Sequence, residues 1–388
     1  MKKIIIVNNN MKVGGVQKSL CNLLREMEGQ YDMTLCLFAA DGVYLEQLPP
    51  SVKVITCRGP VRYLGLSQGQ CRGIHKLIRG GLAVLCRMLG RDRVMKLILA
   101  GPRRIPGEYD HAMAFLHNGR LDGLYGGVQE FVLSHIRAKV KTAFLHCDYG
   151  SCGANTARNN RIISRFDRIA ACSDGCRRVF EKLLPQLAEK CVTVRNFQPY
   201  DDIRALAAAK PVTYEAGWIH GVMVARLAHE KGIERAIAAV DHARAQGFSM
   251  KLHIVGSGAM EQQLRELTQQ RQLQDRVIFY GEQANPYPYM AAADLFLLTS
   301  YHEAAPMVID EAVCLGLPVL TVQTTSSHEM VTQRGAGWVC DNDQAALNAA
   351  LVDILRQEDA LNTIKTGLRM QAVDNSAAAE QLRLLIEG

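Results

Sequence analysis

The sequence of 388 residues has no long hydrophobic run. No stretch of about 18 uncharged apolar residues occurs, so we expect no segment that spans a bilayer. The first apolar run, Lys3–Val7, is too brief for a signal peptide and is better explained as a strand. A hydrophobic content of 48% with 21% charged residues is typical of a soluble globular protein. We therefore expect a cytoplasmic protein that is long enough for two domains of ordinary size.

A disulfide framework and the usual zinc motifs are also missing. The twelve cysteines are scattered through expected strands and helices, which indicates buried thiols in a reducing compartment. The pairs Cys147/Cys152 and Cys172/Cys176 are not spaced as in the usual zinc motifs. The segment Asp341–Asp343 follows the last expected strand and is explained as a helix start. We therefore expect neither a metal nor a cofactor.

Acidic residues are nearly absent from residues 58–104. This stretch has eleven Lys or Arg against one acid, Asp92, while the rest of the chain has 34 basic and 37 acidic residues. Apolar residues recur within it at helical spacing from Ile74 to Leu89. A basic amphipathic helix favours binding to an anionic membrane surface, and the alternative is a helix whose apolar side packs on its own domain. Because Tyr63 is the one aromatic available for stacking, we expect no nucleic-acid partner.

The sequence does contain a regular alternation of strand-like apolar runs and helical patterns. Runs of strand length recur from Lys3 to Arg195 and again from Trp218 to Val322. Such alternation predicts parallel, doubly wound sheets. We therefore expect an α/β protein with one domain in residues 1–200 and a second in residues 201–372.

Two glutamates follow the strand-length run Asp294–Leu298. Glu303 stands in the next loop, and Glu311 stands in a helix whose first turn suits Pro306 and which Gly316 ends. Loops of this kind lie at the carboxyl edge of an open α/β sheet, where ligands bind. Glu311 is predicted to be half-buried, and it needs a partner because desolvating an unpaired charge is costly. Neighbouring backbone or a lysine could be that partner as well as a ligand.

Glycines and histidines stand directly after other expected strands. Gly14 and Gly15 separate the first strand from a helix, an arrangement that offers N–H groups to an anion or a sugar hydroxyl, or that is a plain tight turn. His117 and His146 each follow the carboxyl end of a strand, which places them in the ligand crevice of such a sheet. Lone histidines at such positions are also common as surface or capping residues.

Two basic residues follow the end of another expected strand. Arg226 and Lys231 precede a helix that begins near Ile233, and two cations with a helix N-terminus would bind a diphosphate strongly. The alternative is a pair of exposed surface cations. Gly256 opens a Gly-x-Gly turn after the next strand, but the third glycine and the distal acid of the dinucleotide fingerprint are absent.

These motifs together resemble one enzyme family. Glu303 and Glu311, with seven residues between them, resemble the E-x7-E motif of retaining GT-B glycosyltransferases of family 4, the glycosyl transferases group 1. The segment Arg226–Gly232 is similar to the diphosphate site of that family. The segment Thr142–Asp148 is similar to the one whose histidine contacts the donor sugar.

The resemblance implies a fold and a reaction. It implies a GT-B protein, in which two Rossmann-like domains face a central cleft and a C-terminal helix, here in residues 373–388, crosses back to the first domain. The second domain would bind a nucleotide-diphosphate sugar as co-substrate, and the first a saccharide or lipid-linked acceptor. The reaction would be a retaining, metal-independent hexosyl transfer in surface-glycan biosynthesis.

The resemblance also implies roles for residues. The catalytic residues would be Glu303, Arg226, Lys231 and His146. The donor and its nucleotide would contact Gly15, Gly256, Gln283, Ala305, Pro306, Met307 and Glu311, and the acceptor would contact His117 and Gly14. A nucleotide-sugar epimerase of the same architecture would lack the two glutamates and the spacing of Arg226 and Lys231, and an inactive binding protein would lack one pair. The basic stretch would hold the protein peripherally on the inner face of the plasma membrane.

Overall fold

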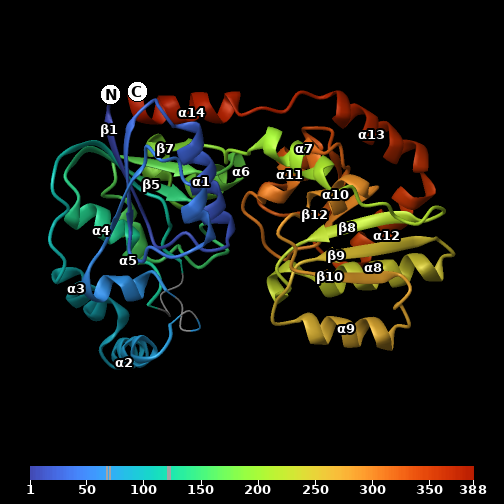
Figure 1. The fold of residues 1–388 in the computed structure, drawn as a ribbon, viewed down its shortest axis with the longest axis horizontal. Helices are drawn as coiled ribbons and strands as arrows, with labels where there is room; N and C mark the ends of the chain where they lie inside the picture. Colours follow the sequence, from blue (N-terminus) through green and yellow to red (C-terminus); the bar gives the residue numbers. More distant parts are fainter. Residues whose placement is uncertain (67–68, 70, 120–123) are drawn as a thin grey trace. The chain divides into compact units, whose positions relative to one another are not determined.

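The chain folds into two compact units, each organised around one parallel sheet (Figure 1). The computed structural model describes residues 1–66, 69, 71–119 and 124–388. Unit 1 consists of residues 1–197 and 375–388, and unit 2 of residues 198–374. Among the described residues, no helix combines the length and the apolar character needed to span a bilayer.

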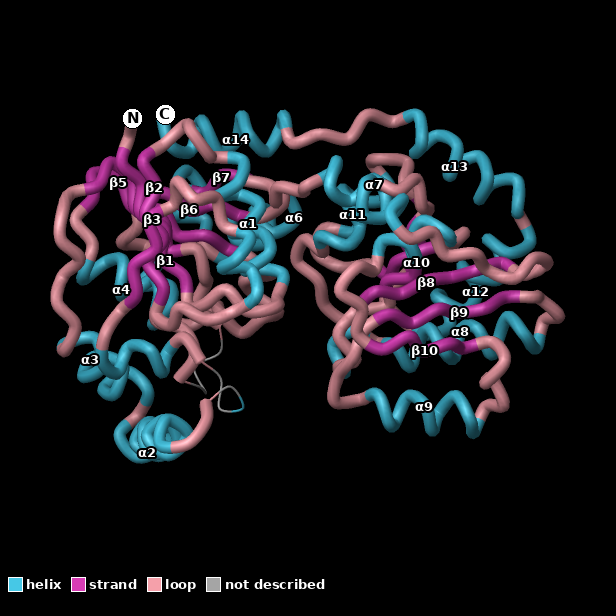
Figure 2. The backbone as a smooth tube through the Cα atoms, in the orientation of Figure 1, coloured by secondary structure: helices cyan, strands magenta, loops and turns pink. Residues whose placement is uncertain are grey.

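Unit 1 contains a seven-stranded parallel sheet in the order β3-β2-β1-β4-β5-β6-β7 (Figure 2). Its strands are β1 (Lys3–Asn8), β2 (Asp32–Leu37), β3 (Lys53–Thr56), β4 (Tyr109–Ala114), β5 (Ala138–Leu145), β6 (Arg168–Ala171) and β7 (Cys191–Thr193). A parallel sheet is covered on both faces, which explains why the central strand β1 has an unbroken apolar run that is wholly buried.

The helices of unit 1 include one from the far end of the chain. They are α1 (Gly15–Glu26), α2 (Ile74–Leu89), α3 (Arg91–Ala100), α4 (Val128–His135), α5 (Ala157–Ile163), α6 (Asp174–Leu183) and α14 (Ser376–Glu387). Helix α14 packs Leu382 and Leu385 into the same core as β1 and α1. Lys2 Nζ donates to Ile386 O at 3.0 Å, so the two termini lie together (Figure 1).

Unit 2 contains a six-stranded parallel sheet in the order β10-β9-β8-β11-β12-β13. Its strands are β8 (Ile219–Val224), β9 (Met250–Val255), β10 (Val277–Gly281), β11 (Leu295–Leu298), β12 (Val319–Val322) and β13 (Gly337–Cys340). Its helices are α7 (Tyr200–Ala209), α8 (Ile233–Ala245), α9 (Glu261–Gln270), α10 (Tyr287–Ala292), α11 (Met307–Cys314), α12 (Gln344–Arg356) and α13 (Glu358–Met370). Asp343 caps α12 by accepting from Ala346 N at 2.8 Å, which agrees with its interpretation as a helix start.

In both sheets the first strand lies in the interior of the sheet. Later strands are added first on one side of it and then on the other. In unit 1 the strand order reverses between the neighbours β1 and β4, and in unit 2 between β8 and β11. The loops that leave two such strands diverge and open a crevice at the carboxyl edge of the sheet, where ligands bind. The prediction of two doubly wound, Rossmann-like domains is therefore confirmed, while the central cleft stays a prediction.

The basic stretch forms helices α2 and α3, and much of its apolar surface faces solvent. Leu77 is 77% exposed, and Ile74 and Met88 are similarly exposed. Two of the arginines instead point inward: Arg79 Nε donates to Leu66 O at 2.7 Å, and Arg91 is also buried. The alternative in which the apolar side of α2 packs on its own domain therefore does not describe these three side chains.

Two histidines inside the sheets make the fold sensitive to acid. Burial, aided by the charges of Arg168 and Lys2, lowers the pKa of His111 to about 4. Burial, aided by the nearby His220, lowers the pKa of His253 to about 3. Each imidazole is neutral in the folded chain and takes up a proton near pH 6.5 in the unfolded chain, so unfolding is favoured as the pH falls below that value.

We therefore expect the melting temperature to fall steadily between about pH 7 and pH 5, with His111 alone contributing about 2 kcal/mol of lost stability. The measurement is a series of thermal unfolding curves against pH. Replacing the exposed His242 by Gln should leave this slope unchanged, whereas His111→Gln should flatten it. A melting temperature that rises toward pH 5 would contradict this account.

Candidate active site

The carboxyl edge of unit 2 has an ion pair at the point where its strand order reverses. Strands β8 and β11 are parallel neighbours, so the loops after them start side by side. Lys231 Nζ from the first loop lies 2.6 Å from Glu303 Oε1 in the second. Ser300 Oγ donates to the same oxygen at 2.8 Å. The side chains of Lys231 and Glu303 are 25% and 11% exposed, so each charge is partly desolvated and satisfied by the other.

A glycine lets these two loops approach. Gly232 has a positive φ of 59°, and a Cβ at this position would lie 2.3 Å from Thr299 O. Thr299 Oγ1 donates to Gly232 O at 2.7 Å, which ties the loop after β8 to the end of β11. A larger residue would push Lys231 away from Glu303.

Arg226, the other predicted cation, is held less firmly. Its side chain is 71% exposed and its Nη2 lies 2.6 Å from Glu230 Oε1. An exposed pair of this kind contributes about 0–1 kcal/mol, so an anionic ligand could readily take Arg226 from Glu230. The two cations therefore leave the strand end together, as predicted, but each is paired with its own carboxylate.

The second glutamate of the motif lies deeper than predicted. Glu311, in helix α11, is 4% exposed and not half-buried, because the helix packs closely onto the sheet. Pro306 is the N-cap residue of α11 and does not stand in its first turn. Since proline has no N–H, the donors at this helix start come from Ala305 and Met307. The carbonyl of Met307 accepts from Gln198 Nε2 at 3.1 Å.

The turns after β9 and β10 complete this edge. Gly256 has a φ of 140°, and a Cβ there would lie 1.9 Å from Ala225 O, so the turn after β9 packs directly on the end of β8. Gln283, after β10, donates from Nε2 to Tyr280 O at 2.8 Å. Gly256 therefore has a packing role that the Gly-x-Gly pattern alone did not reveal.

A cavity of ≈ 490 Å³ opens at the same edge. It is lined by His229, Glu230, Tyr301 and His302, which stand in sequence beside Lys231 and Glu303, and by Asn342, which follows β13. Its volume is in the range of small-molecule sites.

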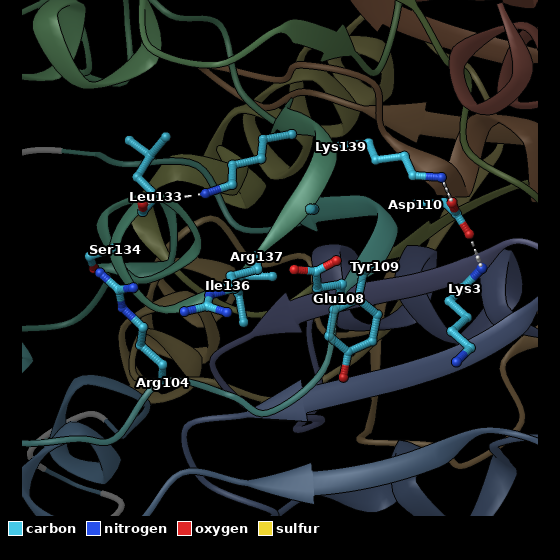
Figure 3. Close-up of a pocket in the computed structure, with 12 residues that line it drawn as sticks. Lys3, Arg104, Glu108, Tyr109, Asp110, Leu133, Ser134, Ile136, Arg137 and Lys139 are labelled. Atoms are coloured by element: carbon cyan, nitrogen blue, oxygen red, sulfur yellow. Dashed lines mark hydrogen bonds and ion pairs between the residues drawn. The ribbon is translucent and has the colours of Figure 1, made fainter.

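A second cavity, of ≈ 700 Å³, lies away from every predicted site residue. Figure 3 shows it at the amino ends of β1, β4 and β5, on the opposite edge of the unit 1 sheet. Asp110 in its wall is paired within the protein: Lys139 Nζ contacts Asp110 Oδ1 at 2.7 Å, and Lys3 N donates to Asp110 Oδ2 at 2.9 Å (Figure 3). Ligands of doubly wound sheets bind at the carboxyl edge, so we do not assign the reaction to this cavity.

The carboxyl edge of unit 1 contains the other predicted residues. Gly14 is the N-cap residue of α1, and a Cβ there would lie 2.5 Å from Gln17 Oε1. Gly15 begins the helix and has open space beside it, so packing does not require glycine at that position. His117 and His146 follow the neighbouring strands β4 and β5 and therefore lie at the same edge.

The two histidines are both neutral. Burial lowers the pKa of His117 to about 4. Burial, with a smaller effect of the charge on His117, lowers the pKa of His146 to about 3. His117 Nδ1 and His146 Nε2 are buried without a hydrogen-bond partner among the described residues. Such atoms are available to a ligand, because a buried polar atom is normally paired.

An asparagine network beside Gly14 was not predicted from the sequence. Asn8, Asn9 and Asn10 are all buried; Asn8 ends β1 and the other two follow it. Asn9 Nδ2 donates to Leu64 O at 3.0 Å, and Asn10 Nδ2 contacts Gly65 O at 2.5 Å. Three consecutive asparagines at the end of a buried strand were the available signal, because amides buried at a sheet edge need defined partners.

Comparison with known proteins adds to this geometry. Residues 220–370 match the sequence model of the family Glycosyl transferases group 1. WcaL of Escherichia coli (strain K12), a glycosyltransferase provisionally assigned to colanic acid biosynthesis, is 30% identical over 55% of this chain and 55% of its own length. The amylovoran biosynthesis glycosyltransferase AmsK of Erwinia amylovora is 30% identical over 35% of this chain and 36% of its own length. The chain thus spans about half the length of these curated relatives, or less.

Solved structures cover the whole chain. The Anabaena Alr3699/HepE protein in complex with UDP and glucose superimposes with a TM-score of 0.69 at 19% identity, over 100% of both chains. WaaG, a glycosyltransferase involved in lipopolysaccharide biosynthesis, superimposes with a TM-score of 0.60 at 16% identity, over 99% of this chain and 100% of its own. At these identities the likeness shows the fold alone.

The close approach of Gly256 to β8 generates a stability prediction. Gly256→Ala should cost about 2–4 kcal/mol, because its Cβ would overlap a backbone carbonyl at a positive φ. Gly367→Ala is the matched control, since a Cβ there meets nothing within 4 Å. Urea or thermal unfolding measures both variants, and a wild-type unfolding curve for Gly256→Ala would refute the packing role.

The two parallel sheets with reversed strand order are those of the GT-B fold. The Lys231–Glu303 pair and Glu311 lie within the matched region. The chain therefore has the GT-B fold, and its residues 220–370 match the family Glycosyl transferases group 1.

Proposed function

We propose that the protein is a retaining glycosyltransferase. It transfers a hexosyl group from a nucleotide-diphosphate sugar to a saccharide or lipid-linked acceptor in surface-glycan biosynthesis. The observation that supports this best is the Lys231–Glu303 ion pair, because it joins the diphosphate motif and the paired-glutamate motif at the strand reversal of unit 2. The names of WcaL and AmsK, and the UDP and glucose bound to Alr3699/HepE, point in the same direction.

Unit 2 binds the donor in this proposal. Glu311, almost fully buried in the middle of α11, accepts the ribose hydroxyls, since a desolvated carboxylate forms strong charge-assisted hydrogen bonds. Gly256 allows the nucleoside to approach the end of β9, and Gln283 faces the base. Glu303, oriented by Ser300, accepts hydroxyls of the donor sugar.

The leaving diphosphate is stabilised by Arg226, Lys231 and the N–H groups of Ala305 and Met307. Charge grows on the diphosphate as the glycosidic bond breaks, and preorganised cations and a helix start stabilise that charge most in the transition state. The chemistry therefore needs no magnesium or manganese ion on the diphosphate.

Unit 1 binds the acceptor. The Gly14–Gly15 loop and His117 contact it, while His146 contacts the donor sugar. Because the lowered pKa keeps His146 neutral, it provides a hydrogen bond without repelling a positively charged sugar in the transition state. No described residue stands out as a nucleophile. The acceptor oxygen therefore bonds to the anomeric carbon on the face that the phosphate leaves, and its proton passes to the departing phosphate oxygen.

The two alternative functions, an epimerase and an inactive binding protein, are less well supported. A nucleotide-sugar epimerase would have no use for a Lys231–Glu303 pair beside Arg226. An inactive binding protein would lack one of the two pairs, and both Glu303/Glu311 and Arg226/Lys231 are present.

We further propose that α2 and α3 attach the protein to an anionic membrane surface. The exposed apolar side chains of Ile74, Leu77 and Met88 would enter the interface, and each nearby cation contributes about 1 kcal/mol within a Debye length. Arg79 and Arg91 are buried and take no part, so the attraction comes from exposed residues such as Arg87 and Arg93. In this proposal the protein lies on the inner face of the plasma membrane, near a lipid-linked acceptor.

The central test combines donor identification with a site variant. Incubation with a panel of nucleotide sugars should give slow hydrolysis and a raised melting temperature with one of them. Glu311→Ala should weaken binding of the matching nucleoside diphosphate about 10- to 100-fold, since charge-assisted hydrogen bonds contribute about 1.5–3 kcal/mol each. Glu266→Ala, which removes an exposed carboxylate of α9, is the control. Unchanged affinity in a folded Glu311→Ala variant would remove Glu311 from the site.

Arg226→Ala and Lys231→Ala should each lower kcat by about 10- to 1000-fold and raise KM much less, because their charge acts mainly on the opened bond. Arg265→Ala removes an exposed, ion-paired arginine on α9 and serves as control. Steady-state kinetics with the identified donor separates kcat from KM. A wild-type kcat in either variant would rule out the leaving-group role.

Membrane attachment can be measured by vesicle sedimentation. Binding should rise with the fraction of phosphatidylglycerol in phosphatidylcholine vesicles and fall as salt is added. Replacing Arg72, Arg87 and Arg93 together by Gln should abolish it, while nucleotide binding is kept.

The matched control replaces three exposed arginines of unit 2, Arg204, Arg265 and Arg356, by Gln and lowers the net charge equally. This variant should still sediment with anionic vesicles. If the wild-type protein does not sediment with such vesicles at low salt, α2 does not bind the membrane and has only a structural role.

A further inference from the structure

Three side chains with metal-binding atoms converge at the carboxyl edge of unit 1. His117, Cys147 and Cys152 each offer one ligand atom, and these three atoms all lie within 4.8 Å of one another. The two sulfur atoms are 3.0 Å apart. The sequence did not predict a site here. Its spacing relates the two cysteines to each other, but it does not show that His117 lies beside them.

The sheet brings the histidine to the cysteines. Strands β4 and β5 are parallel neighbours in which Ala114 lies opposite Ala143. His117 and Cys147 follow these two positions by three and four residues, so both leave the sheet at the same edge. This convergence needs only the register of β4 and β5.

A hydrogen-bonded turn places Cys152 beside Cys147. Asp148 Oδ1 accepts from Gly150 N and from Ser151 N, each at 2.9 Å. Cys152 N then donates to Asp148 O at 3.0 Å. These bonds hold the two thiols on the same side of the turn, so binding an ion requires little rearrangement of the backbone.

The donor set has the chemistry of a zinc site. Thiolates and imidazoles are the ligands that zinc prefers. The four residues between Cys147 and Cys152 exceed the two of the usual motif, but they lie within the range found in zinc sites. Tetrahedral zinc holds two sulfurs about 3.8 Å apart, so the thiols need to open by less than 1 Å. His117 Nδ1 is buried and has no hydrogen-bond partner among the described residues, which leaves a polar atom that an ion would satisfy.

We propose that His117, Cys147 and Cys152 bind one zinc ion through three protein ligands and leave its fourth position open. Binding releases the two thiol protons and forms two Zn–S bonds and one Zn–N bond. Cys147 is buried while Cys152 is partly exposed, so Cys152 provides the route of entry.

The ion would fix the positions of the two loops that supply its ligands. It would tie the loop after β4 to the loop after β5, and His146 immediately precedes the ligand Cys147. When His117 binds the ion, it no longer contacts the acceptor directly. The acceptor would then contact the open coordination position of the ion. This role is separate from the diphosphate, which unit 2 binds through Arg226 and Lys231.

The nearby pair Cys172 and Cys176 provides an internal control. Their sulfurs lie 3.9 Å apart after strand β6, and they are not part of the three-ligand cluster. A site that depended on cysteine content alone would respond to these thiols as well.

The test measures metal binding by the full chain, purified with its thiols reduced. Elemental analysis after dialysis against zinc should give one zinc per chain. Titration with cobalt(II) in its place should give the thiolate-to-cobalt charge-transfer absorption. Cys152→Ser should raise the dissociation constant for zinc at least about 100-fold, more than the loss of an outer partner of a ligand costs. Cys172→Ser should bind zinc like the wild type.

His117→Gln provides a second variant that leaves both thiols in place, and it should lose zinc to a similar extent. Near-ultraviolet circular dichroism shows whether each variant is folded. The proposal fails if the reduced wild type takes up neither zinc nor cobalt, or if folded Cys152→Ser and His117→Gln bind zinc as tightly as the wild type. It also fails if Cys172→Ser loses zinc as completely as Cys152→Ser, or if the Cys147 and Cys152 thiols form a disulfide whose reduction does not restore zinc uptake.

Discussion

The Lys231–Glu303 ion pair is the interaction on which the assignment of the site depends. Its two members are 72 residues apart and come from loops after different strands. They meet because β8 and β11 are parallel neighbours at the point where the strand order reverses. Parallel strands deliver all their carboxyl ends to one edge, so polar residues after those ends gather there without any local signal between them.

Close backbone approach is the second requirement. Gly232 against Thr299 and Gly256 against Ala225 both occupy places where a Cβ would overlap a carbonyl oxygen. These contacts bring the ends of β8, β9 and β11 into a compact edge, beside which a cavity of ≈ 490 Å³ is open. The glycines are therefore needed for the shape of the site whether or not they touch a ligand.

The two units place different chemistry at equivalent positions. In unit 2 the strand reversal is lined by charges, which suits the phosphates of a donor. In unit 1 it is lined by neutral groups, the buried amides of Asn8–Asn10 and two histidines whose pKa values burial has lowered. A neutral, hydrogen-bonding edge suits a hydroxyl-bearing acceptor, so the charges that each sheet buries agree with the division of roles that we propose.

The sequence by itself determined the fold class, and it contained the residues that we propose for the unit 2 site. Apolar runs alternating with helical patterns are a local property, because a buried parallel strand must be apolar throughout, and they predicted both sheets. The spacing of Glu303 and Glu311 and of Arg226 and Lys231 lies within single loops and helices, so a short stretch of sequence contains it. Even the interpretation of Asp343 as a cap required only its neighbours along the chain.

Only the tertiary structure decided how distant segments meet. It paired Lys231 with Glu303, buried Glu311 more deeply than its helical pattern predicted, and turned Arg79 away from the exposed face of α2. It also brought His117 to Cys147 and Cys152, which no spacing could show. The reason is that strand order and register set which loops become neighbours, and these arise from packing of the whole sheet and not from any local pattern.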